Sequence, residues 1–310
     1  MIYLGVDIGG MSIKVGVVDE GGNLLSKVSD VTPLGNPDQA IELIATLCRE
    51  AVREAGHRWE DVQGIGAGAP GTVDGDVVTY ATNIGWYGVD FCAKLSALTG
   101  VKVAVGNDAN CALLAEVKFG VARGYRDVAM VTLGTGVGTA FLCGGTLLLG
   151  NGGAAGEGGH MRTKSLGNRC SCGRLDCWEL YASASALQRR AQAVIGHNPT
   201  GIMAKLARER GKVDGRVFFD ALHAGDQDAE AQLKEFQQDV VDGLVNIANL
   251  FRPQLIVVGG GIAAQPRMIA PLEGMVAQET LGGEGNPHVK VLAATMGNDA
   301  GIVGAAVQVM

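Results

Sequence analysis

One histidine and three cysteines with the chemistry of metal ligands lie close together in the chain, at His160, Cys170, Cys172 and Cys177. Thiolate sulfur and imidazole nitrogen suit Zn²⁺, and four protein ligands close its tetrahedral shell. Disulfides are not expected, because the N-terminus carries no secretion signal. The set therefore predicts a structural zinc site. The other cysteines lie in apolar runs and are expected to be core thiols: Cys48, Cys92, Cys111 and Cys143.

A second group of polar side chains lies between a predicted strand, Val101–Val105, and a predicted helix, Ala109–Lys118. An isolated Asp108 at this place is most often only a helix cap. Here Asn107 and Asn110 flank it, and carboxylate and amide groups at the end of a strand are what a polyol substrate needs. The group is therefore a candidate substrate site.

Two glycine-rich turns, each between two predicted strands, are candidate phosphate sites. They are Asp7-Ile8-Gly9-Gly10-Met11-Ser12-Ile13-Lys14 and Leu133-Gly134-Thr135-Gly136-Val137-Gly138-Thr139. Glycine lets backbone N–H groups approach phosphate oxygens without a Cβ in the way, and Asp7 could hold Mg²⁺ through water. An ordinary hairpin turn is the alternative. The matching positions of the two turns favour the interpretation that both turns bind the same polyphosphate.

A third glycine run, Gly259-Gly260-Gly261, follows the predicted strand Leu255–Val258 at an expected helix start. It fits the Gly-x-Gly-x-x-Gly/Ala dinucleotide pattern, but too little chain follows for the rest of that fold. Contact of these glycines with a nucleoside is the interpretation that requires less, because it does not need a complete dinucleotide-binding fold. The chain has no Gly-x-x-x-x-Gly-Lys-Ser/Thr motif, which excludes a P-loop protein.

The elements that must position these residues repeat along the chain. Strands are predicted at Ile2–Ile8, Ser12–Asp19, Leu24–Val31, Val62–Ala67, Val101–Val105, Asp127–Leu133, Val137–Cys143, Leu147–Leu149 and Leu255–Val258. Helices are predicted at Asp38–Ala55, Ala109–Lys118, Ala229–Phe251 and Asp299–Val309. Each half begins with a strand, a glycine-rich turn and a second strand. This indicates a duplication into two α/β domains, with a boundary near Gly120–Gly124.

Composition narrows the possible functions. The 310 residues include 48 glycines without a three-residue period, and 47% are apolar, which excludes collagen and a disordered chain. A net charge of −7 without a basic block argues against nucleic acid or an anionic membrane as partner. Glycines interrupt the one long uncharged stretch, between Asp127 and Glu157, so no membrane span is expected. We therefore expect a cytoplasmic protein.

Six motifs together resemble the ROK (repressor, open reading frame, kinase) family of sugar kinases. They are Asp7-Ile8-Gly9-Gly10, Gly68-Ala69-Pro70-Gly71-Thr72-Val73-Asp74, Asn107-Asp108-Ala109-Asn110, Gly134-Thr135-Gly136, Glu157-x-x-His160 and the Cys170/Cys172/Cys177–Glu179 block. The resemblance covers the chain from Ile2 to its last helix. It implies a duplicated actin-like ATPase (ribonuclease H-like, hexokinase) fold, with ATP in a cleft between two α/β domains. The expected domains are 1–120, joined by a C-terminal helix at 297–310, and 121–296, with the zinc-binding loop.

The resemblance also implies roles for individual residues. Asp108 resembles the general base of the family. The residues similar to sugar ligands are Gly71, Asn83, Asn107, Asp108, Glu157, His160 and Glu179. Those that match nucleotide or Mg²⁺ contacts are Asp7, Gly9, Gly10, Lys14, Gly134, Thr135, Gly136, Gly260 and Gly261. His160 and the three cysteines match the zinc ligands. Two positions depart from the family: Met11 replaces the usual Thr, and Asp176 replaces a usual Gly.

The activity implied is ATP-dependent phosphorylation of a hexose, first of all glucose at its 6-hydroxyl, with Mg²⁺ and a structural Zn²⁺. N-acetylmannosamine, N-acetylglucosamine and fructose are alternative acceptors, and polyphosphate is an alternative donor. A sugar-responsive repressor is disfavoured, because the first strand begins at Ile2 and leaves no room for a helix-turn-helix. Asp108 argues against a sugar sensor without activity. The family also implies a homodimer or a higher homo-oligomer.

Overall fold

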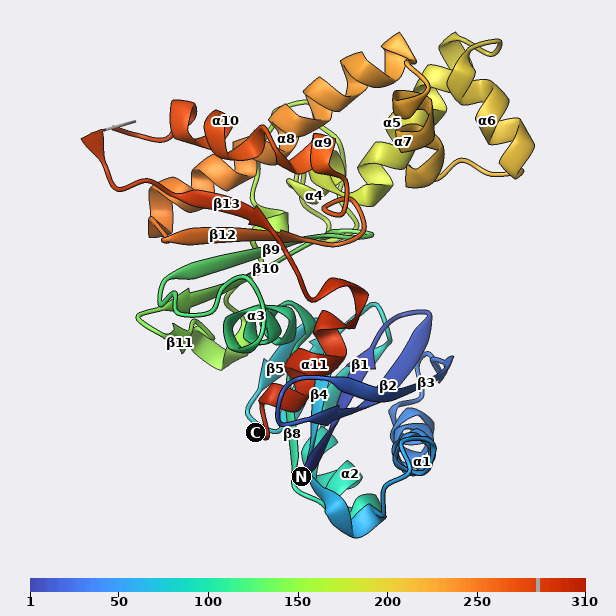
Figure 1. Ribbon diagram of the computed structural model, residues 1–310, viewed down its shortest axis with the longest axis vertical. Helices are drawn as coiled ribbons and strands as arrows, with labels where there is room; N and C mark the ends of the chain where they lie inside the picture. The colour runs from blue at the N-terminus through green and yellow to red at the C-terminus, as the bar shows by residue number, and fades with distance from the viewer. Residues whose placement is uncertain (283–284) are drawn as a thin grey trace. The chain divides into compact units, whose positions relative to one another are not determined.

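A computed structural model describes residues 1–282 and 285–310 of the chain (Figure 1). The described residues form two compact units. The first comprises residues 1–130, 140–156 and 294–310, and the second comprises 131–139 and 157–293. The domain limits expected from the sequence, 1–120 with 297–310 and 121–296, stay a prediction. The two units are described separately below.

The first unit contains a five-stranded sheet in the order β3-β2-β1-β4-β8. Its strands are β1 (Ile2–Ile8), β2 (Ser12–Asp19), β3 (Leu24–Val31), β4 (Val62–Ala69) and β8 (Val103–Asn107). β1 and β2 pair antiparallel, whereas β1 with β4 and β4 with β8 pair parallel. The predicted meander of three strands is confirmed. Parallel pairing brings the carboxyl ends of β1, β4 and β8 to one edge of the sheet, where Asp7 lies near the end of β1, Gly71 follows β4 and Asp108 follows β8.

The other elements of the first unit are short, apart from the helix that follows the meander. They are α1 (Pro37–Glu54), α2 (Phe91–Thr99), α3 (Asp108–Lys118), α11 (Ala300–Val307) and a three-stranded sheet of β5 (Thr72–Asp74), β6 (Val77–Ala81) and β7 (Trp86–Val89). Helix α1 begins where the Asn36 side chain accepts the N–H of Gln39 and Pro37 supplies the first turn. Its buried face includes Ile41, Ile44 and Cys48.

Three glycines allow α11 to pack at backbone distance from its neighbours. A Cβ added to Gly66 of β4 would lie 1.7 Å from the carbonyl oxygen of Ala305 in α11. A Cβ added to Gly304 of α11 would lie 1.6 Å from the carbonyl oxygen of Cys111 in α3. Gly5 of β1 makes the same kind of contact with Ile302. Helix α11 is therefore an integral part of the first unit, although it lies at the end of the chain (Figure 1).

A second five-stranded sheet repeats the strand order of the first. Its order is β11-β10-β9-β12-β13, from β9 (Val128–Leu133), β10 (Val137–Cys143), β11 (Thr146–Leu147), β12 (Leu255–Gly259) and β13 (Lys290–Ala293). In both sheets the third, second, first, fourth and fifth strands of the set are neighbours in that order. The predicted duplication is therefore confirmed at the level of topology.

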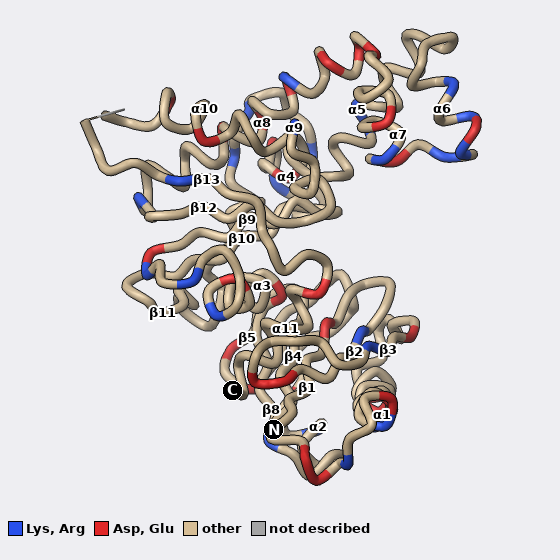
Figure 2. Tube along the Cα trace, in the orientation of Figure 1, with Lys and Arg blue, Asp and Glu red and all other residues tan. Residues whose placement is uncertain are grey.

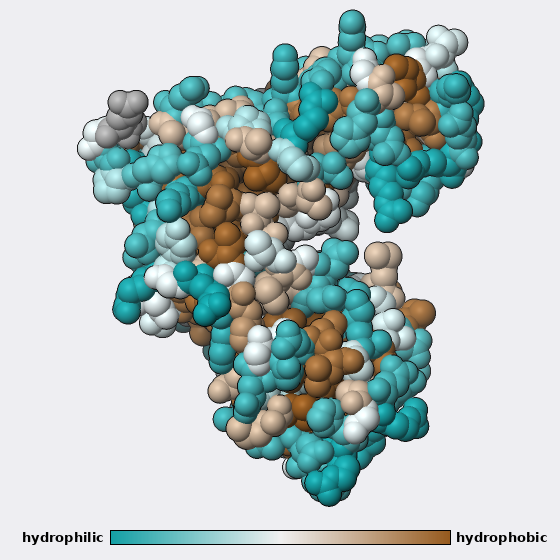
Figure 3. Space-filling view, viewed as in Figure 1, coloured by the Kyte–Doolittle hydropathy of each residue, from teal (hydrophilic) through white to brown (hydrophobic). Residues whose placement is uncertain are grey.

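The second unit carries most of the helices. They are α4 (Glu179–Ala182), α5 (Ala184–His197), α6 (Ile202–Arg210), α7 (Gly215–His223), α8 (Gln227–Phe251), α9 (Pro266–Ile269) and α10 (Leu272–Glu279). Helix α6 buries Met203, Ala204 and Ala207. It carries charged residues of both signs in Figure 2 and lies under a hydrophilic surface in Figure 3. Its polar composition therefore reflects its position at the outside of this unit.

Some sequence predictions are wrong in detail. No helix begins at Gly261: a turn closes with the N–H of Ala263 on the carbonyl of Gly260, and α9 begins only at Pro266. Strand β8 runs to Asn107, two residues beyond the predicted end. Cys143 is exposed rather than a core thiol, because it ends β10. Among the described residues, no helix has both the length and the hydrophobicity to span a bilayer.

Candidate functional site

Asn107 and Asp108 lie where β8 meets α3. The Oδ1 atom of Asn107 accepts the N–H groups of Ala109 at 2.9 Å and Asn110 at 3.2 Å, and its Nδ2 donates to the carbonyl of Gly71 at 3.0 Å. Asn107 is therefore the helix cap, and Asp108 is the first helical residue, where the helix N-terminus favours a negative charge. The cap fixes this end of α3 and joins it to Gly71.

Gly71 directly precedes β5 of the small three-stranded sheet, and Asn83 lies in a turn of the same sheet. Gly71 adopts a φ of 83°, and a Cβ there would lie 2.1 Å from the carbonyl oxygen of Tyr80. Asn83 is exposed in the turn between β6 and β7. Its carbonyl oxygen lies 3.8 Å from where a Cβ would stand on Gly10. Asn83 is therefore near the first glycine turn, within the first unit.

Asp7 and Lys14 form an ion pair beside the first glycine turn. The Nζ atom of Lys14 lies 2.8 Å from Oδ2 of Asp7, because the register of β1 and β2 places the two residues opposite each other. The turn closes with the N–H of Gly9 donating to the carbonyl of Ser12 at 3.0 Å. The lysine therefore balances the charge of the carboxylate that the sequence assigns to Mg²⁺.

The second glycine turn, from Gly134 to Gly136, is tied to the start of α5. The N–H of Gly134 donates to the carbonyl of Gly136 at 3.0 Å, and the N–H of Ala184 donates to the carbonyl of Gly134 at 2.8 Å. The Ser185 hydroxyl donates to the carbonyl of Thr135 at 2.8 Å. These bonds hold two carbonyls of the turn against α5.

Three glycines of the predicted nucleotide set have no internal reason to be glycine. At Gly10, Gly134 and Gly261 the φ is not positive, and an added Cβ would meet no protein atom closer than 3.8 Å. By contrast, a Cβ on Gly260 would lie 2.4 Å from the carbonyl oxygen of Leu133, at a φ of 91°. Other described glycines with this freedom are Gly196, Gly215, Gly274 and Gly285. Close approach of a ligand to the backbone is a reason for glycine at the three turn positions.

The four predicted zinc ligands lie together in the second unit. One ligand atom from each of His160, Cys170, Cys172 and Cys177 falls within 4.8 Å of all the others. The sulfur atoms of Cys172 and Cys177 are 3.6 Å apart, and Nδ1 of His160 lies 3.9 Å from the sulfur of Cys170. Ligands on a tetrahedral zinc ion are roughly 3.8 Å apart, because Zn–S bonds are about 2.3 Å long. The cluster therefore fits the size and the donor set of a zinc site.

The three thiols differ in acidity. Burial raises the pKa of Cys170, and burial together with the neighbouring thiols raises that of Cys177 to about 12. Burial also acts to raise the pKa of Cys172, but hydrogen bonds from the backbone at Arg174 and from the other thiols lower it overall. Binding of a metal would displace the protons from the two less acidic thiols.

His160 lies between two carboxylates and the thiols. Its Nδ1 atom is 3.7 Å from Oε1 of Glu179, and its Nε2 atom is 3.9 Å from Oε2 of Glu157. The thiol of Cys170 donates to Oε1 of Glu179 at 3.0 Å. A Cβ on Gly136 would lie 2.5 Å from Oε2 of Glu179, so this side chain also touches the second glycine turn. The two ring nitrogens of His160 therefore face different partners, which allows one to bind metal while the other faces substrate.

The predicted residues divide between the two units. The first unit holds Asp7, Gly9, Gly10, Lys14, Gly71, Asn83, Asn107 and Asp108. The second holds Gly134, Thr135, Gly136, Glu157, His160, Cys170, Cys172, Cys177, Glu179, Gly260 and Gly261. The assignment of each residue to sugar, nucleotide or metal stays a prediction.

Three side chains that support the site were not predicted from the sequence. The Thr139 hydroxyl accepts the N–H of Gly158 at 2.9 Å and so holds the turn that carries Glu157 and His160. Asp176 and Glu116 are fully buried carboxylates. A hydrogen bond from the Tyr181 hydroxyl, opposed by burial and aided by backbone N–H groups, holds the pKa of Asp176 below its usual value. Threonines and acids are too common for their residue type to mark such roles.

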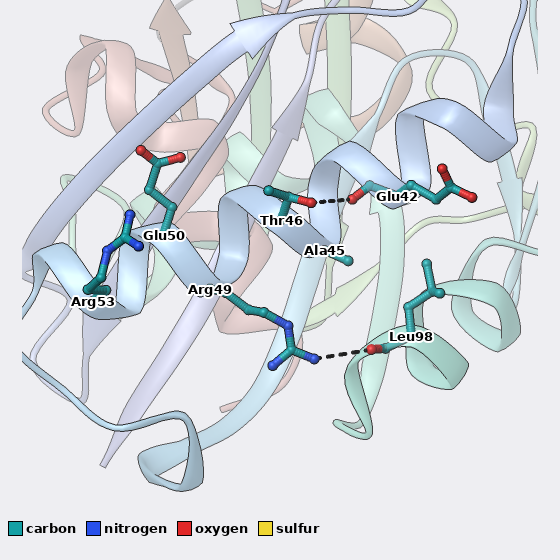
Figure 4. A pocket seen from close by; sticks show the side chains of 7 residues that line it. All are labelled: Glu42, Ala45, Thr46, Arg49, Glu50, Arg53 and Leu98. Atoms are coloured by element: carbon teal, nitrogen blue, oxygen red, sulfur yellow. Dashed lines mark hydrogen bonds between the residues drawn. The ribbon is translucent and has the colours of Figure 1, made fainter.

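A surface cavity of about 500 Å³ in the first unit is not part of this site. It lies along α1 and is lined by Glu42, Ala45, Thr46, Arg49, Glu50, Arg53 and Leu98 (Figure 4). Arg49 donates to the carbonyl of Leu98 at 3.3 Å, and the charged side chains of both signs alternate along the helix. No residue of the predicted site is among those that line it.

Comparison with known proteins agrees with these features. The model of the ROK family matches residues 3–310. Glucokinases from Streptomyces coelicolor and Thermotoga maritima are 37% and 32% identical, over 98% of this chain and over 96% and 95% of theirs. A solved ROK family glucokinase from Streptomyces griseus, in complex with glucose and AMPPNP, is 36% identical with a TM-score of 0.87. The match covers 99% of this chain and 98% of the Streptomyces griseus chain. This likeness confirms the predicted fold class, a duplicated α/β fold of the actin-like ATPase type.

Proposed function

This chain belongs to the ROK family, and on that premise we propose that it is an ATP-dependent glucokinase, which converts glucose and ATP into glucose 6-phosphate and ADP. The observation that carries the proposal is Asp108 at the first position of α3, beside a capping Asn107 that is bonded to Gly71. A carboxylate held in this way can accept a proton from a bound hydroxyl. The similarity to glucokinases along nearly the whole chain supports glucose as the acceptor.

In the proposed mechanism, the Asp108 carboxylate takes the proton from the 6-hydroxyl of glucose as that oxygen bonds to the γ-phosphorus of ATP. The bond between the γ-phosphorus and the oxygen of ADP breaks in the same transfer. General-base catalysis of this kind contributes about 10² to 10⁴ in rate. Asn107, Gly71 and Asn83 in the first unit, and Glu157, His160 and Glu179 in the second, bind the sugar hydroxyls and orient the acceptor.

The glycine turns are proposed to bind the phosphates through backbone N–H groups that are not bonded within the turn, since those of Gly9 and Gly134 already donate to the carbonyls of Ser12 and Gly136. Gly9 and Gly10 lie in one turn and Gly134 to Gly136 in another, and Gly260 and Gly261 meet the nucleoside. The open space beside Gly10, Gly134 and Gly261 supports this assignment. Lys14 adds a positive charge, and Asp7 anchors Mg²⁺, which neutralises phosphate charge when bound. Preorganised donors of this kind supply most of the catalysis in phosphoryl transfer.

The Cys/His cluster is proposed to hold a structural Zn²⁺. The donor set of three sulfurs and one nitrogen, all within 4.8 Å, supports zinc rather than a metal that prefers oxygen. Bound zinc would fix the ring of His160 through Nδ1 and leave Nε2 to face the sugar. The cluster thereby contributes to sugar binding without touching the phosphates.

A coupled assay across hexoses and phosphate donors tests the function. The panel is glucose, fructose, N-acetylmannosamine and N-acetylglucosamine, each with ATP and with polyphosphate. The expected result is the highest kcat/KM with glucose and ATP. A higher value with an N-acetylhexosamine or with fructose would contradict glucokinase activity, and no phosphorylation of any sugar would contradict a kinase. A homo-oligomer and a cytoplasmic location stay predictions.

A further inference from the structure

Asp176 has an unusual backbone conformation immediately before the zinc ligand Cys177. Its φ is 58°, and Arg252 is the only other non-glycine residue with a positive φ in the described part of the chain. The side chain is fully buried, although Gly173, Arg174 and Leu175 before it are exposed. A left-handed conformation is uncommon for a residue with a side chain, and aspartate adopts it when its carboxylate is bonded locally, so the contacts of Asp176 support it.

The contacts of the Asp176 carboxylate tie together three parts of the loop. Its Oδ1 atom accepts the N–H of Asn168 at 3.0 Å and the hydroxyl of Tyr181, which lies in α4. Its Oδ2 atom accepts the N–H of Gly167 at 2.9 Å, and the guanidinium of Arg162 lies 3.6 Å away. One carboxylate therefore joins the start of the loop, its end and the helix that follows.

The backbone of Asp176 reinforces the same closure. Its N–H donates to the carbonyl of Asn168 at 2.8 Å, and its carbonyl accepts the N–H of Thr163 at 3.2 Å. Cys170 and Cys172 lie on the segment between Asn168 and Asp176. The positions of these two metal ligands therefore depend on a closure made by protein atoms alone.

The residues that flank this loop are also held without metal. The indole N–H of Trp178 donates to the carbonyl of Asp239 at 2.8 Å, and a Cβ on Gly243 of α8 would lie 2.0 Å from the buried Trp178 ring. The Nζ atom of Lys164 lies 2.8 Å from Asp239 and 2.7 Å from Asp242. Both flanks of the loop are thus attached to α8.

We propose that Asp176 is a positioning residue that orders the loop of residues 167–176 before metal binds, so that a thiolate-preferring divalent cation meets a preformed set of ligands. The proposal rests on the metal site of the proposed function and not on its kinase activity. Many small metal sites order their loops only when the metal binds. Preorganisation reduces the entropy that binding must otherwise overcome, which strengthens binding.

Limited trypsin digestion of the whole protein after removal of metal by a chelator tests the proposal, because Arg169 and Arg174 are exposed within the loop. The metal-free wild type should resist cleavage at these residues, as read by mass spectrometry of the fragments. Metal-free Asp176→Asn should be cleaved there about ten-fold faster or more, because its amide group would face backbone N–H donors. Equal cleavage of metal-free wild type and variant would overturn the proposal.

Two further variants separate the carboxylate from the backbone. Asp176→Gly removes the carboxylate and also the steric cost of a positive φ, because glycine adopts it freely. Tyr181→Phe removes only the hydrogen bond from the Tyr181 hydroxyl to the carboxylate. We expect rapid cleavage of the glycine variant and an intermediate rate for Tyr181→Phe. If Asp176→Gly resisted trypsin as the wild type does, the loop would need only a suitable backbone, and the proposal would fail.

The rate of metal release, compared with that of a matched control variant, separates a local effect on the loop from general destabilisation. Asp214→Asn is the matched control, because Asp214 also accepts two backbone N–H groups in the second unit, as the cap of α7. Transfer of zinc from each protein to a chromogenic chelator should be about ten-fold faster for Asp176→Asn than for wild type. It should be unchanged for Asp214→Asn. Equal release rates for the two variants would contradict the positioning role.

Discussion

Glu116 in the first unit and Asp176 in the second are both fully buried carboxylates, and they hold the chain over very different distances. Glu116 lies on the regular helix α3 and accepts the N–H groups of Val121 at 2.9 Å, Thr295 at 2.7 Å and Met296 at 2.8 Å, together with the Thr295 hydroxyl. Asp176 lies in a loop and accepts N–H groups at Gly167 and Asn168.

This difference separates long-range from local order. Thr295 is 179 residues from Glu116 in the chain, and it lies just before α11. Asn168 is only 8 residues from Asp176. Loss of Glu116 should therefore affect the folding of the first unit, because the segment that leads into α11 loses its anchor. Loss of Asp176 should affect one loop and leave the rest of its unit folded.

The largest expected effect is on catalysis and comes from Asp108, at the other end of the helix that carries Glu116. Together the two residues distinguish a catalytic role of α3 from a role in folding. Asp108→Ala should lower kcat by about a thousand-fold or more, because the proposed base is lost, while glucose still binds. A coupled assay gives kcat, and calorimetry gives the affinity for sugar. Retained turnover in this variant would show that Asp108 is not the base.

Glu116→Ala is expected to have the largest effect on stability. Removing the fully buried carboxylate leaves three partly buried backbone N–H groups and a hydroxyl without their acceptor, at a cost of about 3 kcal/mol or more in the free energy of unfolding. Urea unfolding measures it. Glu42→Ala on the exposed face of α1 is the control and should be neutral. Similar urea midpoints for Glu116→Ala and Glu42→Ala would show that Glu116 does not anchor the first unit, and the difference from Asp176 would be wrong.

Removal of zinc should have a smaller effect, confined to the binding of the sugar. If Asp176 keeps the loop in place, the metal-free enzyme loses only the zinc ion that orients the ring of His160. Its KM for glucose should then rise about ten-fold, with a smaller change in the KM for ATP. Cys172→Ser should reproduce this result, whereas Cys143→Ser, which changes an exposed thiol outside the cluster, should not. Normal binding of glucose without metal would contradict the role given to zinc.

The smallest expected effect comes from a partly exposed carboxylate, Asp19, with similar hydrogen bonds, and this comparison isolates the contribution of burial. Asp19 accepts the N–H of Gly21 at 2.8 Å, and the backbone and side-chain N–H groups of Asn23 both at 2.9 Å. The Asn23 side chain first, and then backbone N–H groups, hold its pKa below the ordinary 3.8. Asp19→Asn should cost only a few tenths of a kcal/mol at pH 7, because water screens the exposed charge.

The sign of the pH dependence follows from the lowered pKa of Asp19. Its contribution to stability is present above the ordinary pKa and is lost as the pH falls through the lower pKa of the folded state. The difference in melting temperature between wild type and Asp19→Asn should therefore shrink on acidification below 3.8. A difference that grew in acid would contradict this assignment. A loss as large as that of Glu116→Ala would show that burial is not what separates the two carboxylates.

The longer regular elements could be predicted from their own residues. The strands Ile2–Ile8, Ser12–Asp19 and Leu24–Val31 and the helix that ends at Phe251 have long apolar patterns with clear turns or caps. The strands β5, β6 and β7 have 3, 5 and 4 residues, which is too short for a period to be recognised. The helices between Ala184 and His223 were also missed.

The candidate site divides in the same way. The spacing of His160 and the cysteines predicted a metal cluster, because ligands close in the sequence can surround one ion. The contact of Glu179 with Gly136, and the pairing of Asp7 with Lys14, depend on how strands and helices pack. No local pattern marks Asp176 as a buried acceptor, since an aspartate in a glycine-rich loop usually faces water.

The sequence by itself determined the duplicated pattern of strands, the glycine turns and the types of residue available for chemistry, because these depend on neighbours along the chain. Only the tertiary structure decided that Glu116 anchors the segment before α11, and that Asp176 closes the cysteine loop from a left-handed conformation. Both carboxylates are buried, and burial gives an ordinary carboxylate its importance because a buried acceptor must be satisfied by the N–H groups around it.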